Sequence, residues 1–397
     1  MEITRDVARA SLQREVLIAL GLSIGAAVAL GFSRFAYALL LPPMRETLGL
    51  SYVEAGALNT ANAVGYIFGS LAAALSARRW GAKRPFQLGF LVSALVLALS
   101  AATSDFTMLF LLRTIGGIST AFAFILGAAL AGAICPGSSA ERKGFLVGLY
   151  VAGSSLGIVV SGIAVPFALQ EGPQGWREGW MILGCLALLG ALPAAMAARS
   201  VPAPATGVSA MLRLADFRRL TPAILGYGLF GAGYVGWMTF IIALLRDQGG
   251  SSGQTAGFWI LLGLTSTIST LLWGRVLAQL PGGRGPALIF FITMLGTLPV
   301  LIQPGLFSAF LSAVVFGSSF MAGPAAVTIL AQRQLPASAL TAAVALLTVA
   351  FALGQSIGPI LAGMITDVTG QVAAGLWASP ALLGLAAIAS LFQRRAD

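Results

Sequence analysis

Long runs of apolar residues, separated by short polar segments, recur along the whole chain. Each run holds about 18 residues or more, which as a helix is long enough to cross a bilayer core of roughly 30 Å. The runs do not alternate between polar and apolar residues, as the strands of a membrane β-barrel do over about ten positions. Because only helices and closed barrels satisfy the backbone inside a bilayer, the pattern predicts transmembrane helices.

We predict twelve such spans, and the chain is therefore expected to be an all-α membrane protein. The first fifteen residues are polar, and the run that follows is about 25 residues long, which exceeds the core of a signal peptide, so we expect an uncleaved first helix. The predicted spans are residues 16–41, 53–76, 86–103, 106–134, 145–168, 179–198, 222–245, 255–274, 286–304, 306–331, 338–366 and 373–392.

The composition agrees with a chain that lies mostly in lipid. Of the 397 residues, 58% are hydrophobic and only 9% are charged, whereas soluble domains carry roughly 25% charged residues. The two cysteines, Cys135 and Cys185, fall at the end of one predicted span and inside another. We therefore expect no structural disulfide between them.

Sequence patterns for catalysis are scarce. Residues 153–157 read GSSLG and match the nucleophile-elbow pattern, which needs a strand-to-helix turn and a histidine base. Here the segment lies within a predicted helix and the chain has no histidine, which excludes Ser–His catalysis and H-E-x-x-H zinc sites. A Walker P-loop pattern is also missing from the sequence. We expect no enzyme, no cofactor and no metal.

The net charge of +10 is distributed unevenly along the chain. With the N-terminus placed in the cytoplasm, 18 of the 23 Lys and Arg residues fall on the cytoplasmic side and three on the outer side, while Arg34 and Arg113 lie within spans. Such a bias is the positive-inside rule, so the basic charge reports membrane orientation and indicates no nucleic-acid partner. We expect a multi-pass protein of the bacterial inner membrane with both termini in the cytoplasm.

An internal repeat divides the chain at its longest polar connection, residues 199–221. A shift of 201 residues places segment 45–56 on 246–257 and segment 153–162 on 354–363, with nine identities in 22 positions. The matched pairs include Gly49 with Gly250, Ser51 with Ser252, Ala55 with Ala256, Gly56 with Gly257, Gly157 with Gly358 and Gly162 with Gly363.

Six spans in each half give both halves the same orientation, which describes a parallel repeat. In transporters with such repeats the substrate site lies near the bilayer midplane between the halves. We predict an N-terminal six-helix bundle (1–198), a cytoplasmic linker (199–221) and a C-terminal six-helix bundle (222–397), related by pseudo-symmetry.

Two six-helix halves joined by a basic loop resemble the major facilitator superfamily. The basic segment 78–84, the string RTIGG at 113–117 and the glycine-rich segments 153–162 and 354–363 are similar to motifs of that superfamily. Arg78 stands where the loop motif normally has an aspartate. The strings GFSRFAY at 31–37 and GWR at 175–177 look like the YbfB/YjiJ-type branch. The resemblance implies the major facilitator fold and secondary transport, and it supplies no substrate.

Two arginines inside predicted spans are the most informative candidates for a site. Arg34 lies deep in the first span, where a central arginine costs roughly 2.5–3.5 kcal/mol on insertion scales. One interpretation is an anchor for a carboxylate or phosphate, since guanidinium holds such groups bidentately. The other is a structural arginine that caps carbonyls or pairs with Glu54. Arg113 has the same two interpretations, with coupling or substrate binding on one side and bonds to neighbouring helix ends on the other.

Polar and aromatic residues on other spans are candidates for a cavity wall. Asn59 and Asn62 share a helical face with Tyr66 and Ser70, and this face either lines a cavity or joins helices. The complete set of predicted substrate-binding residues is Arg34, Tyr37, Asn59, Asn62, Arg113, Tyr227, Tyr234, Trp237 and Gln355, with Glu54 as the coupling candidate. For Tyr227, Tyr234 and Trp237, core packing is the competing interpretation.

The function that the sequence favours is secondary transport of a small organic anion by alternating access, with proton coupling left open. The spans contain two cationic side chains and no central carboxylate. A carrier of cations would usually need a buried carboxylate. The alternative is a multidrug or metabolite exporter with an aromatic cavity. A membrane sensor is disfavoured because the longest loop is only about 22 residues long, too short for an output domain. We expect a monomer whose partners are the bilayer and a small, anionic substrate.

The charge bias predicts the topology. Reporter fusions after Ala396 and within residues 199–221 should both give a cytoplasmic signal in a topology assay. A periplasmic signal from either fusion contradicts the orientation and the even number of spans.

Overall fold

The computed structural model describes residues 2–172, 174–202 and 214–394, and within these ranges the chain is helical and contains no strand. The helices of the first part are α1 (Glu2–Ala26), η1 (Ala27–Phe35), α2 (Tyr37–Leu48), α3 (Tyr52–Trp80), α4 (Lys83–Ser100), α5 (Phe106–Gly132), α6 (Ala140–Ala168), η2 (Leu169–Glu171) and α7 (Gly175–Ser200). Those of the second part are α8 (Leu214–Asp247), α9 (Ser252–Leu277), α10 (Arg284–Ile302), α11 (Leu306–Gly317), η3 (Phe320–Ala322), α12 (Gly323–Gln334), α13 (Ala337–Thr369), α14 (Val372–Leu376) and α15 (Ala378–Leu391).

Eleven helices within the described residues are long and apolar enough to cross a membrane, one fewer than the twelve predicted. The segment missing from the eleven is α4, the third predicted span. It has only 18 residues, and Lys83 and Arg84 at its start lower its mean hydropathy. It is nevertheless a complete helix, and it packs along α5 and α7.

Two predicted spans depart from a simple α-helix. The first, predicted for residues 16–41, is one apolar span from Leu12 to Leu48, and in its middle lies the π-helix η1, which is wound with i→i+5 hydrogen bonds. The tenth, predicted for 306–331, is interrupted between α11 and α12 by the short 3-10 helix η3. Neither irregularity follows from hydropathy, because mean hydropathy is high along both segments and does not depend on how the backbone is wound.

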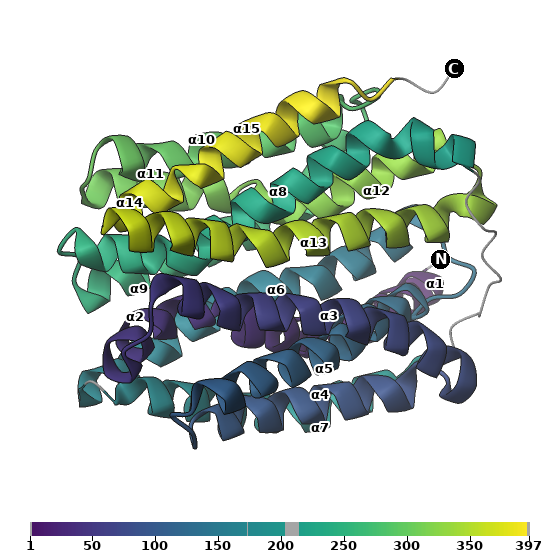
Figure 1. Ribbon diagram of the computed structural model, residues 1–397. Helices are drawn as coiled ribbons and strands as arrows, with labels where there is room; N and C mark the ends of the chain where they lie inside the picture. The colour runs from purple at the N-terminus through teal and green to yellow at the C-terminus, as the bar shows by residue number, and fades with distance from the viewer. Residues whose placement is uncertain (1, 173, 203–213, 395–397) are drawn as a thin grey trace.

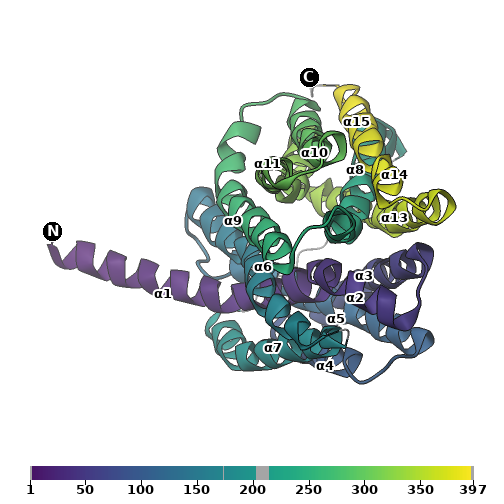
Figure 2. The same ribbon diagram turned by 90° about the vertical axis from the view of Figure 1, so that its left-hand side faces the viewer.

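The helices of the two chain halves lie on opposite sides of the molecule (Figures 1 and 2). The boundary between α1–α7 and α8–α15 is formed mainly by α3 packed along α13, α6 along α9, and α2 against α8. We call the end where α2 ends and α3 begins the distal end. α8 begins and α15 ends at the opposite, proximal end (Figure 1).

Helices α7 and α8 extend into both ends of the predicted linker, residues 199–221. Helix α7 continues to Ser200 and α8 begins at Leu214. Residues 203–213 of the predicted linker lie outside the described residues.

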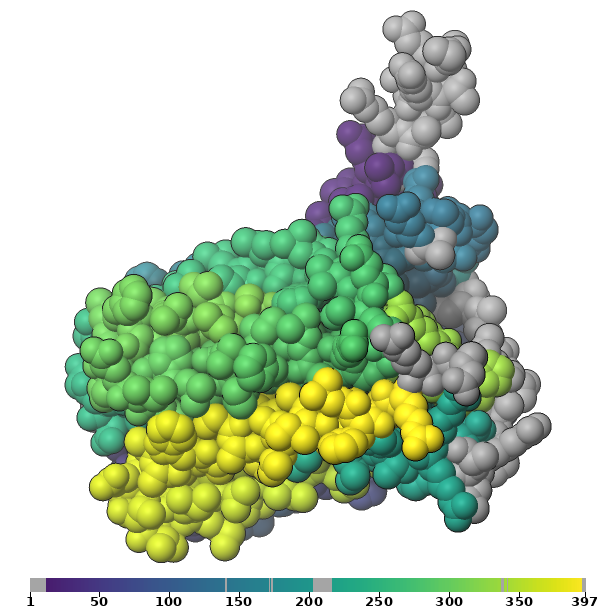
Figure 3. All heavy atoms as spheres, turned by 90° about the horizontal axis from the view of Figure 1, so that it is seen from above, coloured from purple at the N-terminus to yellow at the C-terminus, as the bar shows by residue number. Residues whose placement is uncertain are grey.

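The outer surface of the helices is apolar, as a lipid-facing surface must be. Large side chains on it are more than half exposed, including Leu189 on α7, Leu272 on α9 and Ile388 on α15. Figure 3 shows one such face, made by α9–α11 in green and α13–α15 in yellow-green to yellow. A soluble protein would bury these residues, so their exposure agrees with a membrane environment.

Close contacts between helices recur at positions related by the predicted repeat. A Cβ atom at Gly157 of α6 would meet the backbone of Ala27 and Gly31, and one at Gly358 of α13 would meet the backbone of Ala232 on α8. Because Gly157 and Gly358, and likewise Gly31 and Ala232, are 201 residues apart, equivalent helix pairs approach through equivalent residues. Small residues at these sites let the backbones come together.

At the distal end the register of the repeat is 200 residues and not 201. Ser51 caps α3 and forms a capping box with Glu54, while Ser251 caps α9 and forms one with Gln254. The alignment of Ser51 with Ser252 was therefore wrong by one residue. Cap geometry reveals the true pairing because each serine must directly precede its helix.

The glycine contacts lead to a stability prediction. In Gly157→Ala the added methyl group would lie 2.6 Å from the Ala27 carbonyl oxygen, a backbone atom that no rotamer change can move. We expect overpacking to cost about 1–3 kcal/mol and to lower the melting temperature in detergent by roughly 2–10 °C.

Gly274→Ala is the matched control, since a Cβ atom at Gly274 of α9 meets nothing within 4 Å. It should leave the melting temperature unchanged or raise it slightly. Equal behaviour of the two variants would contradict the close approach of α6 and the first span.

Candidate functional site

A cluster of polar side chains is buried at the boundary between the two chain halves. Arg34 of η1, Asn59 and Asn62 of α3, and Arg113 of α5 are each less than 8% exposed. The sequence placed these residues on three separate spans, and the structure brings them together. An apolar interior tolerates such groups only where they find partners.

Arg113 uses its whole guanidinium group for contacts within its own half. Nε donates to the Leu58 carbonyl oxygen (3.3 Å), Nη1 to the Ser33 carbonyl oxygen, and Nη2 to Asn59 Oδ1 (3.3 Å). The guanidinium carbon also lies 4.7 Å from the centroid of the Tyr37 ring. This geometry ties η1, α3 and α5 together, in agreement with the structural interpretation of Arg113.

Arg34 is only partly satisfied. Its Nε donates to Asn62 Oδ1 across 3.4 Å, and its guanidinium carbon lies 4.8 Å from the centroid of the Tyr66 ring. Its Nη2 is buried and has no hydrogen-bond partner among the described residues. Because a charged donor without an acceptor is costly inside a protein, Nη2 is the atom of this cluster most available to a ligand.

The alternative pairing of Arg34 with Glu54 is not formed. The Glu54 carboxylate accepts hydrogen bonds from the Ser51 backbone N–H (2.8 Å) and from the Ser51 hydroxyl group (3.0 Å). These bonds hold Glu54 in the exposed first turn of α3, at the distal end of the molecule.

The two asparagines lie between the arginines and connect the cluster to the other half. Asn62 Nδ2 donates to the Arg113 carbonyl oxygen (3.3 Å), while its Oδ1 accepts from Arg34. Asn59 Nδ2 donates to Thr239 Oγ1 of α8 across 2.6 Å. The predicted polar face of α3 thus joins both arginines to the second half of the chain.

Tyr37 is fully engaged in contacts with the first half. Its hydroxyl group donates to the Ala55 carbonyl oxygen (2.8 Å), and its ring stacks on Trp180 with centroids 6.5 Å apart. It therefore supports the Arg113 side chain.

An aromatic cluster in the second half surrounds two of the predicted residues. Tyr227 lies 4.5 Å from Phe351 between ring centroids, and Tyr234 lies 5.4 Å from Phe230 and 5.8 Å from Phe351. The Tyr227 ring is stacked among other rings as core packing would place it. Tyr234 reaches the boundary, where its ring stacks on Phe320 with centroids 5.7 Å apart.

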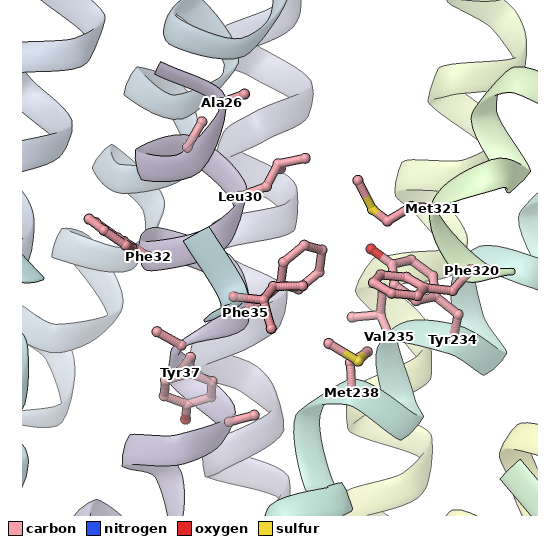
Figure 4. Packing of buried hydrophobic residues seen from close by; sticks show 14 of the residues in the cluster. Ala26, Leu30, Phe32, Phe35, Tyr37, Tyr234, Val235, Met238, Phe320 and Met321 are labelled. Atoms are coloured by element: carbon pink, nitrogen blue, oxygen red, sulfur yellow. The ribbon is translucent and has the colours of Figure 1, made fainter. Parts of the chain in front are cut away.

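Apolar side chains close the boundary beside Tyr234. Figure 4 shows Leu30 and Phe35 of η1 on one side, facing Tyr234, Phe320 and Met321 on the other. The Phe35 and Phe320 rings meet edge to face with centroids 5.9 Å apart. The polar cluster therefore has an aromatic neighbour on the opposite half.

The remaining two predicted residues carry unpaired polar atoms. Trp237 is fully buried against Phe316, and its Nε1 has no partner among the described residues. Gln355 is 1% exposed, and neither its amide nitrogen nor its amide oxygen has a partner within the described chain. A cleft of about 180 Å³ lies elsewhere, between α4 and α7, and is lined by none of the predicted site residues.

Comparison with known proteins places the chain in a family. The family model described as "Uncharacterised MFS-type transporter YbfB" matches residues 26–391. The chain belongs to this YbfB-type family of the major facilitator superfamily. The resemblance predicted from the sequence is thereby confirmed, and both the family and the fold are those of transporters.

Relatives and solved structures agree with this family. The YbfB-type chain is 28% identical to a chloramphenicol resistance protein of Streptomyces lividans, over 91% of this chain and 92% of the relative. Its fold is similar to that of a mutant of the nucleoside transporter NupG, with a TM-score of 0.70, 15% identity, and coverage of 94% of this chain and 98% of the other. It is also similar to a bacterial homologue of the human lysosomal transporter Spinster in an inward-facing, unoccupied conformation, with a TM-score of 0.67, 16% identity, and coverage of 97% and 95%.

Several residues of the YbfB-type site were not among the predicted ones. Thr239 bonds to Asn59, Trp180 stacks on Tyr37, and the Ser33 carbonyl oxygen accepts from Arg113. Threonine and tryptophan inside an apolar span give no local signal, since most such residues bond to their own helix or pack in the core.

Proposed function

We propose that this YbfB-type protein is a secondary active transporter that moves a small organic anion across the plasma membrane by alternating access. In this proposal α4 is the twelfth span, and residues 1–198 and 222–397 are two pseudo-symmetric six-helix bundles. Both termini lie in the cytoplasm, so the distal end faces outward, and the protein works as a monomer. The substrate binds at the boundary between the bundles, near Arg34.

The observation that carries the proposal is the presence of two buried guanidinium groups without a buried carboxylate. Among the residues that the structure describes, no Asp or Glu forms an ion pair with Arg34 or Arg113. Their partners are neutral amide and carbonyl oxygens and aromatic faces. Neutral partners reduce the cost of burying the charge and leave the positive potential in place. Such a site favours an anionic guest.

The two arginines have different parts in this proposal. Arg113 donates from all three guanidinium nitrogens to groups of its own half, so it positions Asn59 and adds to the positive potential. Arg34 has an unpaired Nη2, and the next residue, Phe35, packs against Phe320 of the second half. A carboxylate or phosphate oxygen that accepts from Nη2 would complete its hydrogen bonding with a charge-assisted bond.

Coupling to protons through Glu54 stays part of the proposal. Glu54 caps α3 at the end that this proposal places outside, next to the contacts between α3 and α13. Protonation would remove its charge and weaken the capping box, so a proton would act there on the distal contacts of α3 and not directly on the substrate.

A second function, export of aromatic drug-like molecules, is favoured by a different observation. The stacked rings of Tyr227, Phe230, Tyr234 and Phe351 form a large apolar surface beside the boundary. The similarity to a chloramphenicol resistance protein points the same way. Under this function chloramphenicol would bind and the charge of Arg34 would have little influence.

Substitution of Arg34 distinguishes the two functions. Arg34→Lys should keep part of the binding and transport of an organic anion, because the charge remains while the planar fork is lost. Arg34→Gln should weaken anion binding at least tenfold in titration of the purified protein, since a charged hydrogen bond contributes about 1.5–3 kcal/mol. The protein should remain folded in the membrane.

Arg113→Gln is the comparison variant. It breaks three hydrogen bonds that join η1, α3 and α5, so it should lower the melting temperature more than Arg34→Gln does. Normal anion transport by Arg34→Gln, or a cationic substrate, contradicts the anion proposal and leaves the exporter in its place.

A further inference from the structure

Gln355 lies on α13 between two residues that touch different helices. A Cβ atom at Gly354 would meet the Gly228 carbonyl oxygen of α8, and the Ser356 carbonyl oxygen accepts a hydrogen bond from Thr60 of α3 (2.7 Å). Successive residues of a helix point about 100° apart, so the side chain of Gln355 points between α8 and α3. These two helices are the ones that Asn59 and Thr239 join.

The opposite face of α13 is the lipid-facing one. Leu353 and Ile357 are 55% and 60% exposed, whereas Gln355 is 1% exposed. The amide group is therefore aimed into the protein at the boundary between the halves. It has a donor and an acceptor, and neither finds a partner within the described residues.

A buried amide with two unpaired polar atoms opposes folding, because its hydrogen bonds to water are lost and not replaced. Other buried polar residues of the boundary do not share this property, since Asn59 and Asn62 each donate and accept. The amide of Gln355 has no structural task in this arrangement. A ligand that supplies an acceptor and a donor would satisfy it.

The neighbours of Gln355 indicate the kind of ligand. Phe351, one helical turn earlier on the same face, stacks with Tyr234 at 5.8 Å. Tyr234 in turn stacks on Phe320, which meets Phe35, the residue after Arg34. A series of aromatic contacts thus runs from the neighbourhood of Gln355 on the second half to that of Arg34 on the first.

We propose that Gln355 is a specificity-determining residue that binds a neutral hydroxyl or amide group on an aromatic organic anion whose charged group is held by Arg34. This inference rests on the proposed anion transport and adds to it the class of substrate. A substrate that contacts both groups also links the two halves of the protein, because Arg34 lies in the first half and Gln355 in the second.

The test compares benzoate with 4-hydroxybenzoate, two probes that share a ring and a carboxylate and differ in one hydroxyl group. Titration of the purified full chain with Gln355→Leu should show roughly three- to tenfold weaker binding of 4-hydroxybenzoate and unchanged binding of benzoate. The melting temperature of Gln355→Leu without ligand should be unchanged or higher, because an unsatisfied buried amide has been removed.

Ser356→Ala is the matched control, since the Ser356 hydroxyl group bonds to the Ala352 carbonyl oxygen of its own helix. It should bind both probes as the wild type does. Equal loss of both probes in Gln355→Leu, no loss of either, or a lowered melting temperature without discrimination would overturn the role of Gln355. If the wild type binds neither probe, the aromatic class is wrong, and Arg34→Gln with other anions then tests the proposed function by itself.

A second inference concerns the distal end and rests on different contacts. The Asp367 carboxylate, on α13 of the second half, accepts hydrogen bonds from the backbone N–H groups of Tyr52 and Val53, each at 2.9 Å. These are the first two residues of α3, in the first half. Beside them a Cβ atom at Gly363 would meet the Tyr52 backbone.

The contact joins a negative charge to the positive end of a helix dipole in the other half of the chain. Both N–H groups are among the orphan donors of the first turn, which have no partner within their own helix. Ser51 and Glu54 satisfy other donors of this turn, so Asp367 completes the cap.

We infer that Asp367 is a latch that holds the distal ends of the two halves together and favours the conformation closed at that end. This inference rests on alternating access. Removing the carboxylate frees two N–H groups and loosens the α3–α13 contact, so the open population at the distal end should rise.

Spin-label distances test the latch. Labels at Ala102→Cys and Gln303→Cys, which lie at the distal ends of the two halves, are introduced in a background without Cys135 and Cys185. Asp367→Ala should increase the ratio of long to short distances roughly three- to tenfold, and Asp247→Ala, which removes an exposed acid at the distal end of α8, should not.

If short and long distances are both present and Asp367→Ala leaves their ratio unchanged, the latch is wrong while alternating access still stands. A single short distance in every variant, with and without benzoate, would overturn the latch together with alternating access.

Discussion

The arrangement of the first half depends on how two guanidinium groups are buried in an apolar interior without an opposite charge. A buried cation needs acceptors on several sides, and no single helix can supply them. Two other helices, η1 and α3, therefore converge on Arg113 of α5, and their carbonyl oxygens at Ser33 and Leu58 accept its hydrogen bonds. Asn59 and Asn62 fill the remaining directions and carry the network to Arg34 and to Thr239. The hydrogen bonds of the Arg113 guanidinium group thus fix η1, α3 and α5 relative to one another.

Glycine makes this convergence geometrically feasible. The Gly117 position on α5 touches the backbone of Asn62, so a side chain there would push away the helix that carries both asparagines. Gly65 and Gly69 of α3 likewise lie against the backbone of α5. Close backbone approach therefore brings the polar side chains within hydrogen-bonding distance, and packing and electrostatics are parts of one arrangement.

Most of the spans could be predicted from the sequence because the bilayer imposes length and hydropathy directly on each segment. Features that depend on contacts between spans could not. The π-helical winding of η1 leaves no mark on hydropathy, the bond from Asn59 to Thr239 joins residues 180 positions apart, and α4 falls short of a span by composition although it is complete as a helix. The one-residue error in the distal register has the same cause, since identity counts cannot see which serine caps a helix. For the candidate site, residue type alone selected Arg34 and Gln355, but only the structure reveals which of their atoms lack partners.

The π-helix η1 gives the first span a property that a regular α-helix would not have. Each of its turns closes an i→i+5 bond, as from the Ala36 N–H to the Gly31 carbonyl oxygen (2.9 Å), and so holds more residues than an α-turn. Rewinding the segment to i→i+4 bonds would rotate everything beyond Phe35 about the helix axis without unfolding the chain. Tyr37 and the rest of α2 would turn relative to Ala26 and the rest of α1, with Arg34 at the pivot. A change of winding in η1 would therefore turn the two ends of this span relative to each other at the level of the Arg34 guanidinium group.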